Sequence, residues 1–285
     1  MLISIGELIK RSYNLYKDNF IVLVKYVLLM LVPGILTIII MFVGLLLIKT
    51  DDPVSGPILF LLLPLLFLVF ILIILLGFWF NFALMRVIDA LYKKNAVPTL
   101  KIALIDARKV VWKGMGTIVA AGFYAIWPIF LSIFGFALYR FAIQIINFNA
   151  PILDKVISIL FGLFGIYGLF HMLYYSIKLV FGVYAVVIGG GAIKESLKLS
   201  KLLTDKRWWG IFGRLIGASV VVYIVIMIIN TVLTAVGGLI GGVGDKIATF
   251  LSSVVNLLIT PYTVAIVVIL FNEAKKTQVS TPPQD

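Results

Sequence analysis

The sequence contains no cysteine and a single histidine, His171. Without cysteine, the chain has no disulfide, no thiolate metal ligand and no cysteine nucleophile. One histidine supplies neither a pair of imidazole ligands nor a zincin motif. We therefore expect no metal site and no cofactor.

Charged residues are also scarce. They make up 13% of the 285 residues, whereas apolar residues make up 62%. Soluble domains are about 25% charged and about 45–50% apolar, and a soluble core of this size does not hide so much apolar surface. The composition therefore predicts an all-α polytopic membrane protein.

Six apolar runs are long enough to cross a bilayer as helices, which takes about 20 residues. They are residues 20–48, 57–84, 115–147, 156–188, 210–236 and 247–271. Residues 1–19 lack the uninterrupted apolar core of a cleavable signal peptide, so we expect the first run to stay in the membrane.

Basic residues alternate between the two ends of these runs. The segment before the first run, the connections after the second and fourth runs, and the segment after the last run hold 18 of the 24 Lys and Arg residues when Arg214, near the start of the fifth run, is included. The opposite side holds only Lys49, Lys155 and Lys246 in its connections and Arg140 near the end of the third run. This asymmetry predicts a multi-pass protein of the plasma or inner cell membrane with both termini cytoplasmic. It also accounts for the net charge of +12, so we expect no nucleic-acid partner.

Each basic connection has the pattern of an amphipathic helix that leads into a span. The three segments contain ELIKRSYNLYKDNF, TLKIALIDARKVVW and SLKLSKLLTDKRWW. In the third segment, Lys194, Lys198 and Lys201 share one helical face. Such helices lie in the membrane interface with lysines toward anionic headgroups. We predict three amphipathic helices on the cytoplasmic face, with Lys194, Lys198, Lys201 and Arg207 facing lipid.

The same pattern predicts one integral membrane domain over residues 1–276. It would consist of three helix-plus-hairpin units at 1–96, 97–190 and 191–276, a weak internal repeat of the kind found in transporters. Residues 277–285 are polar and rich in proline, so we predict a disordered tail there.

Polar side chains within the spans mark a candidate site. Lys178, His171 and Tyr174 lie in the fourth run, and Asn81 lies in the second. Ionisable groups inside a membrane are functional candidates. The alternative for Lys178 is that it snorkels to the surface or pairs with a buried carbonyl. The middle of every run lacks Asp and Glu, which argues against proton-coupled antiport and aspartyl intramembrane proteolysis.

The glycines at 189–191 do not form a phosphate-binding loop. That loop needs G-x-x-x-x-G-K-[ST] after a strand, whereas these glycines follow a long apolar run and have the wrong spacing. Because glycine tolerates left-handed backbone, we expect them to end or bend the fourth span.

The layout around the fourth and last runs resembles a known family. Lys178 is followed by VYAVVI, by ESLKLSKLL and by Arg207-Trp208, and the last run reads ITPYTVAIVVILFNEAKK. This order is similar to the membrane domain of the glycerophosphoryl diester phosphodiesterase membrane-domain-like family. The resemblance implies a stand-alone six-span module without the soluble barrel that carries the phosphodiesterase activity. In the family the last run usually ends in an aromatic residue, an acid and Arg, where this chain has Phe271-Asn272-Glu273.

Three functions remain open on this evidence. The first is a non-enzymatic membrane module that engages anionic lipid headgroups, another membrane protein or a second copy of itself through its basic helices. The second is a transporter of a small solute or a lipid. The third is an intramembrane hydrolase, which needs a nucleophile such as Ser252 or Ser253 beside His171. Because the sequence shows no catalytic constellation, we predict that the chain is not an enzyme.

Overall fold

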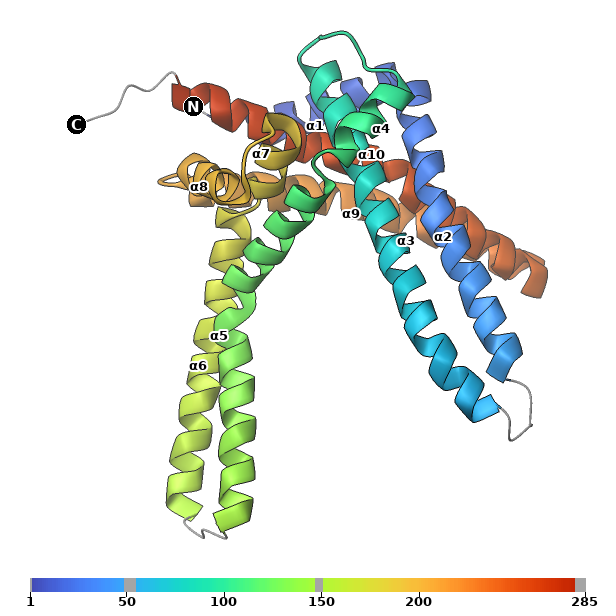
Figure 1. The fold of residues 1–285 in the computed structure, drawn as a ribbon. Helices are drawn as coiled ribbons and strands as arrows, with labels where there is room; N and C mark the ends of the chain where they lie inside the picture. Colours follow the sequence, from blue (N-terminus) through green and yellow to red (C-terminus); the bar gives the residue numbers. More distant parts are fainter. Residues whose placement is uncertain (1, 49–54, 147–150, 280–285) are drawn as a thin grey trace. The chain divides into compact units, whose positions relative to one another are not determined.

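The computed structural model describes residues 2–48, 55–146 and 151–279, which are helical almost throughout and contain no strand (Figure 1). In chain order the helices are α1 (Ile5–Asp18), α2 (Phe20–Ile48), α3 (Ser55–Tyr92), α4 (Leu100–Arg108), α5 (Val111–Ile146), α6 (Pro151–Lys178), α7 (Gly182–Gly189), α8 (Ile193–Thr204), α9 (Trp208–Ile240) and α10 (Gly242–Val279). Six segments are long and apolar enough to cross a bilayer: α2, α3, α5, α6 with α7, α9 and α10. The prediction of an all-α polytopic membrane protein is confirmed.

Side chains cap the first turns of three short helices, α1, α4 and α8. Ser4 Oγ accepts from the backbone N–H of Glu7 at 3.2 Å, and Thr99 Oγ1 accepts from that of Ile102 at 3.4 Å. At α8 the Glu195 carboxylate accepts from the N–H of Ala192 at 3.2 Å. A capped N–H no longer needs a partner in the preceding chain. These caps therefore mark where α1, α4 and α8 begin.

The fourth apolar run forms a candidate span, as predicted, but it is not one continuous helix. Helix α6 ends at Lys178, a turn occupies residues 179–181, and α7 begins at Gly182. Helix α7 then ends where Gly190 adopts φ +72° and its N–H bonds to the carbonyl of Val186 at 2.8 Å. The glycine run therefore ends the fourth span, as predicted.

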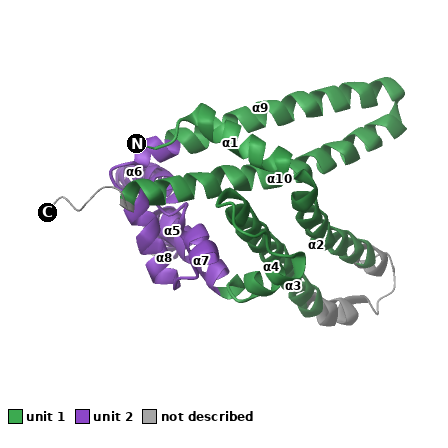
Figure 2. Cartoon of the chain, turned by 90° about the horizontal axis from the view of Figure 1, so that it is seen from above, with its two compact units in different colours: residues 1–112, 213–285 green, residues 113–212 purple. Residues whose placement is uncertain are grey.

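The chain forms two compact units (Figure 2). Unit 1 comprises residues 1–112 and 213–285, and its buried residues include Leu8, Tyr26, Phe82 and Ile269 from α1, α2, α3 and α10. Unit 2 comprises residues 113–212, and its core includes Phe181 and residues of α7 and α8. A short helix precedes a pair of long helices three times along the chain. The two compact units do not coincide with the three predicted units, so an internal repeat stays a prediction.

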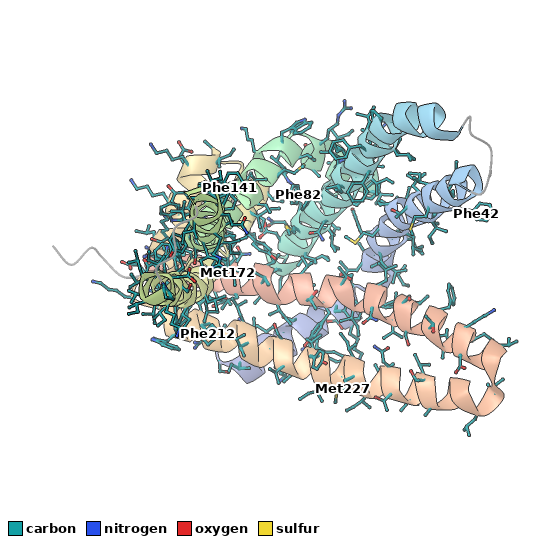
Figure 3. The ribbon with its side chains drawn as sticks, turned by 90° about the horizontal axis from the view of Figure 1, so that it is seen from below. Phe42, Phe82, Phe141, Met172, Phe212 and Met227 are labelled. Carbon is teal, nitrogen blue, oxygen red and sulfur yellow. The ribbon has the colours of Figure 1, made fainter. Side chains whose placement is uncertain are left out.

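The long helices expose large apolar side chains over much of their length. Phe42 and Phe141 are both 62% exposed and Met227 is 48% exposed, whereas Phe82 is only 1% exposed (Figure 3). Apolar surface costs about 25 cal/mol per Å² in water but costs little against lipid tails, which are equally apolar. These exposed faces are therefore the surfaces that meet the bilayer.

Three residues of the predicted tail, 277–279, belong to α10. The rest of the predicted tail, like Lys49, lies outside the described residues.

Candidate functional site

Two hydroxyl groups of α8 hold the interruption between α6 and α7, which we call the break. Ser200 Oγ donates to the carbonyl of Lys178 at 3.0 Å and accepts from the N–H of Phe181 at 3.1 Å. Thr204 Oγ1 also donates to the Lys178 carbonyl, at 3.2 Å. Both side chains are fully buried. They give partners to backbone groups that the end of a helix otherwise leaves open.

The side chain of Lys178 lies at this break. Its Nζ donates to the hydroxyl of Tyr174, one turn earlier, at 2.9 Å. The ring of Tyr174 stacks on Trp208 with centroids 6.0 Å apart, and Trp208 Nε1 donates to the Tyr174 carbonyl at 2.9 Å. Lys178 is therefore the last residue of a helix, held beside aromatic rings, and is not a charge in the middle of a continuous span.

His171 lies two turns before Lys178 on α6. Its ring centroid is 4.4 Å from that of Tyr175, and its Nδ1 lies 3.4 Å from the carbonyl of Ala125 on α5. Among the described residues, no serine or aspartate side chain forms a hydrogen bond with His171. The described geometry therefore pairs His171 with an aromatic ring and a backbone carbonyl, which is not an arrangement of base and nucleophile.

Lys201, one of the predicted lipid-facing residues, lies over two aromatic rings. Its Nζ is 4.7 Å from the ring centroid of Tyr124 and 5.9 Å from that of Tyr175, and these two rings stack 6.4 Å apart. A cation over an aromatic face contributes about 0.5–1 kcal/mol at exposed sites and more when desolvated. Lys194 and Lys198 are exposed, whereas Lys201 and Arg207 are half-buried.

A cavity of about 290 Å³ lies beside the break, between α5 and the α6–α7 segment. Its lining is mostly aliphatic, with Thr117, Tyr175 and Ser176 as the polar members. In the part of the chain that the structure describes, the lining includes neither Lys178 nor His171. The structure thus gathers Lys178, Tyr174 and His171 on α6, in unit 2, and the cavity beside the break is lined by none of the three. Asn81, the fourth candidate, lies half-buried on α3 in unit 1.

A buried polar cluster in unit 1 joins α3 to α10, and the sequence reasoning missed it. Asn272 Nδ2 donates to Asp89 Oδ1 at 2.8 Å, and Lys93 Nζ donates to Asp89 Oδ2 at 2.7 Å. Asp89 and Asn272 are 9% and 5% exposed.

The adjacent residue, Glu273, connects the same helices to α1. Its carboxylate accepts from the hydroxyl of Tyr92, from Arg11 Nη1 at 3.5 Å and from Lys276 Nζ at 3.4 Å. A second hydrogen bond, 2.8 Å long, joins Arg11 Nε to Glu7 and raises the pKa of Arg11. Helix α1 is therefore joined to the C-terminal ends of α3 and α10 by charge-assisted hydrogen bonds.

The outward faces of the short helices mix basic and large apolar side chains. On α4 and at the start of α5, Ile102, Ile105 and Trp112 are 50%, 48% and 71% exposed. Exposed basic residues flank them: Lys101, Arg108 and Lys109. Lys109 Nζ lies 2.8 Å from Asp106, and this hydrogen bond lowers the pKa of Asp106. The remaining basic side chains on α4 give the face its net positive charge.

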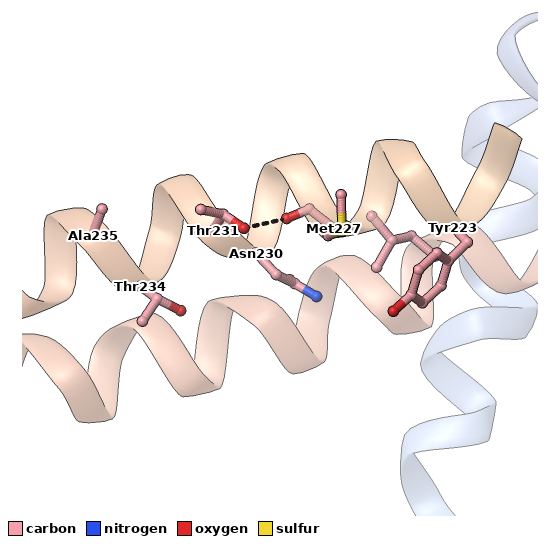
Figure 4. A pocket seen from close by; sticks show the side chains of 7 residues that line it. Tyr223, Met227, Asn230, Thr231, Thr234 and Ala235 are labelled. Carbon is pink, nitrogen blue, oxygen red and sulfur yellow. Dashed lines mark hydrogen bonds between the residues drawn. The ribbon is translucent and has the colours of Figure 1, made fainter. Parts of the chain in front are cut away.

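A groove of about 550 Å³ follows one side of α9 in unit 1, lined by Tyr223, Met227, Asn230 and Thr231 among others (Figure 4). Thr231 Oγ1 donates to the carbonyl of Met227 at 2.8 Å, and the buried Asn230 Oδ1 has no hydrogen-bond partner among the described residues. Polar side chains of this kind join helices in membranes.

The described residues contain no group of three His, Cys, Asp or Glu side chains able to hold a metal ion. In comparisons with known proteins, the chain matches no protein-family model, no curated protein and no solved structure, so the family resemblance stays a prediction.

Proposed function

We propose that this membrane protein is a non-enzymatic module of the cell membrane that binds anionic lipid headgroups through the outward faces of α1, α4 and α8. The observation that carries the proposal is the face of α4. There Ile102, Ile105 and Trp112 are about half exposed or more, and the basic residues Lys101 and Arg108 of the same segment are exposed as well.

Such a face is suited to neither water nor a protein core. A water-facing helix presents charged groups, whereas a core-facing helix buries its apolar ones. A face with both lies in the membrane interface, where apolar side chains enter the acyl region and basic ones meet phosphate. Each Lys or Arg near an anionic surface contributes about 1 kcal/mol, and Trp112 is of the residue type enriched at that depth.

We test the proposal with single-cysteine labelling of the full chain, since the natural sequence offers no competing thiol. An environment-sensitive fluorophore on Ile105→Cys should report an apolar setting in vesicles, and a more apolar one when the vesicles contain phosphatidylglycerol. The control is Lys94→Cys, at the exposed turn after α3, which should report water. A label on Ile105→Cys that reports water in both vesicle types would contradict the proposal.

The charge requirement is tested separately by counting lipids that stay bound to the detergent-purified chain in native mass spectrometry. The triple variant Lys101→Gln, Arg108→Gln, Lys109→Gln should retain less phosphatidylglycerol than the natural chain. The control removes two exposed lysines of the opposite connections, Lys155 and Lys246. Equal loss in both variants would show that net charge alone, and not this face, attracts the lipid.

A transporter is the second candidate, and the break between α6 and α7 is what favours it, because interrupted helices form binding sites in many transporters. Against it stands the mostly aliphatic cavity beside the break. A transporter that uses Lys178 should lose lipid or solute flux in reconstituted vesicles when Lys178 is replaced by Met. No observation favours the intramembrane hydrolase.

A further inference from the structure

An apolar groove in unit 1 has no role in the function proposed above. It has a volume of about 390 Å³ and lies between α1 and the hairpin of α9 and α10. Figure 2 shows these three helices next to one another within unit 1. Ligand cavities in proteins are about 300–1,000 Å³ in volume. The groove is thus large enough for part of a small amphipathic molecule.

The lining is aliphatic on one side and aromatic on the other. Val222 and Val225 come from α9, and Tyr16 and Tyr262 come from α1 and α10 with ring centroids 6.2 Å apart. The described lining contains no charged side chain. An occupant must therefore place an apolar segment inside the groove.

The tyrosines place hydroxyl groups around this apolar space. Tyr16 donates its hydroxyl to the carbonyl of Leu258 at 2.9 Å. Tyr13, which is 53% exposed, and Tyr262 have no hydrogen-bond partner for their hydroxyls among the described residues. Tyrosine combines an apolar ring with a polar tip, so these two hydroxyls can bond to polar groups of a bound molecule.

Two lysines border the groove along α1. Lys10 and Lys17 flank Tyr13 at spacings of three and four residues, which places all three along one edge of the helix. Both lysines are exposed, and neither has an ion-pair or hydrogen-bond partner in the described residues. The neighbouring Arg11 differs, because it is paired with Glu7 and Glu273. The edge of the groove is therefore positively charged and open to an anion.

We propose that this groove binds one anionic phospholipid, with an acyl chain between α1 and the α9–α10 hairpin and the phosphate on Lys10 and Lys17. The site rests on the proposed function, because both require the protein to meet anionic lipid at the same surface. It differs from that function in binding a single lipid within unit 1, without α4 or α8. Charge complementarity with the two unpaired lysines selects an anionic phospholipid over an uncharged apolar ligand.

The test blocks the groove in the full chain and leaves the rest of α9 unchanged. Val225→Trp fills the groove. The control, Val220→Trp, places the same side chain on the other side of α9. The two positions are similarly exposed, Val225 at 46% and Val220 at 49%. Native mass spectrometry of the detergent-purified chain then follows binding of phosphatidylglycerol and phosphatidylcholine. We expect Val225→Trp to weaken binding of the first phosphatidylglycerol about tenfold, and Val220→Trp to leave it unchanged.

The headgroup contact is tested with Lys10→Gln, Lys17→Gln, a surface variant that does not depend on tolerance of a large residue. Two lysines at about 1 kcal/mol each correspond to about a 30-fold effect. We therefore expect the preference for phosphatidylglycerol over phosphatidylcholine to fall by about 30-fold. The matched control, Lys194→Gln, Lys198→Gln on α8, should keep this preference for the first lipid bound.

Several results would overturn the site. Equal retention of phosphatidylglycerol by the two tryptophan variants is one, and an unchanged lipid preference in the Lys10 and Lys17 variant is another. Loss of a dimer in Val225→Trp would show that a second copy of the chain occupies the groove instead. If the α4 variant loses lipid while Val225→Trp does not, the groove is refuted and the proposed function stands. If Val225→Trp loses lipid while the α4 variant does not, the groove is supported and lipid binding by the α4 face is refuted.

Discussion

At the scale of single residues, the break between α6 and α7 depends on small side chains that fit one another. Ser200 serves both ends of the turn, because its hydroxyl bonds to Lys178 and Phe181 at once. Gly182 begins α7 where Leu197 of α8 and Thr117 of α5 leave little room for a side chain. These two residues therefore set the geometry that places Lys178 at the end of a helix.

We predict that Ser200→Ala lowers the free energy of unfolding by about 1–3 kcal/mol, the usual cost of leaving a buried polar group without a partner. The substitution removes the hydroxyl that accepts from the N–H of Phe181, whereas the Lys178 carbonyl keeps its hydrogen bond from Thr204. Thermal unfolding of the detergent-purified chain measures the effect. Ser176→Ala, at an exposed position on α6, is the control, and equal melting of the two variants would contradict the prediction.

We also predict opposite effects for two glycines of α7. A Cβ at Gly182 would lie 3.0 Å from Leu197 Cδ2 and 3.3 Å from Thr117 Cγ2, whereas a Cβ at Gly189 would have no atom within 4 Å. Gly182→Ala should destabilise by about 1–3 kcal/mol, as overpacking does. Gly189→Ala should be neutral or stabilise by up to about 1 kcal/mol, since alanine favours helix. The same melting assay compares them, and a stabilising Gly182→Ala would show that α7 and α8 separate easily.

At the scale of helices, the C-terminal ends of α3 and α10 extend past the apolar runs and pack together. The runs were predicted to end at residues 84 and 271, but the helices continue to Tyr92 and Val279. Hydropathy decreases there because Asp89 and Glu273 are charged, although each accepts a hydrogen bond from the other helix, Asp89 from Asn272 and Glu273 from Tyr92. Local composition detects a loss of apolar character, but it does not show that two such ends meet.

Local composition also does not predict the break between α6 and α7. The segment KLVFGVYAVVI, residues 178–188, is apolar after its first residue and contains no proline, so a single helix was the natural prediction. The groups that interrupt it are Ser200 and Thr204, which lie 19 to 26 residues further along the chain. The spacing of His171, Tyr174 and Lys178 did place these candidates on one helix correctly, because that requires only local geometry.

We predict that Asn272→Leu destabilises unit 1 by about 1–3 kcal/mol, because it removes a donor to the buried carboxylate of Asp89. Asn256→Leu on the same helix is the control. The Asn256 side chain is exposed and bonds only within α10, to the carbonyl of Ser252. Chemical or thermal unfolding of both variants measures the difference. If only Asn256→Leu lowered the stability, the cluster would have no role in holding α3 against α10.

At the scale of the whole molecule, the six long helices and the distribution of basic residues define a topology that can be measured. Two exposed turns, at Lys94 and Lys206, adopt positive φ and belong to the basic connections. Lys155 and Lys246 are exposed near the first residues of α6 and α10, on the side of the connections that hold few basic residues. Both termini are expected on the side of the basic connections.

We predict that a membrane-impermeant thiol reagent added to intact cells labels Lys155→Cys and Lys246→Cys but not Lys94→Cys or Lys206→Cys. The absence of natural cysteine makes each variant a single reporter. Permeabilised cells provide the control, since all four positions should then react. The reverse labelling pattern would place both termini outside and remove the cytoplasmic assignment.

The break also constrains when the fourth span can mature during synthesis. Its carbonyl at Lys178 and its N–H at Phe181 depend on hydroxyls that follow 19 to 26 residues later. At about 5–20 residues per second, a ribosome needs on the order of one to five seconds to add that stretch. During this interval the break lacks the hydroxyls that bind it, so a nascent chain that ends before Ser200 presents an unfinished span.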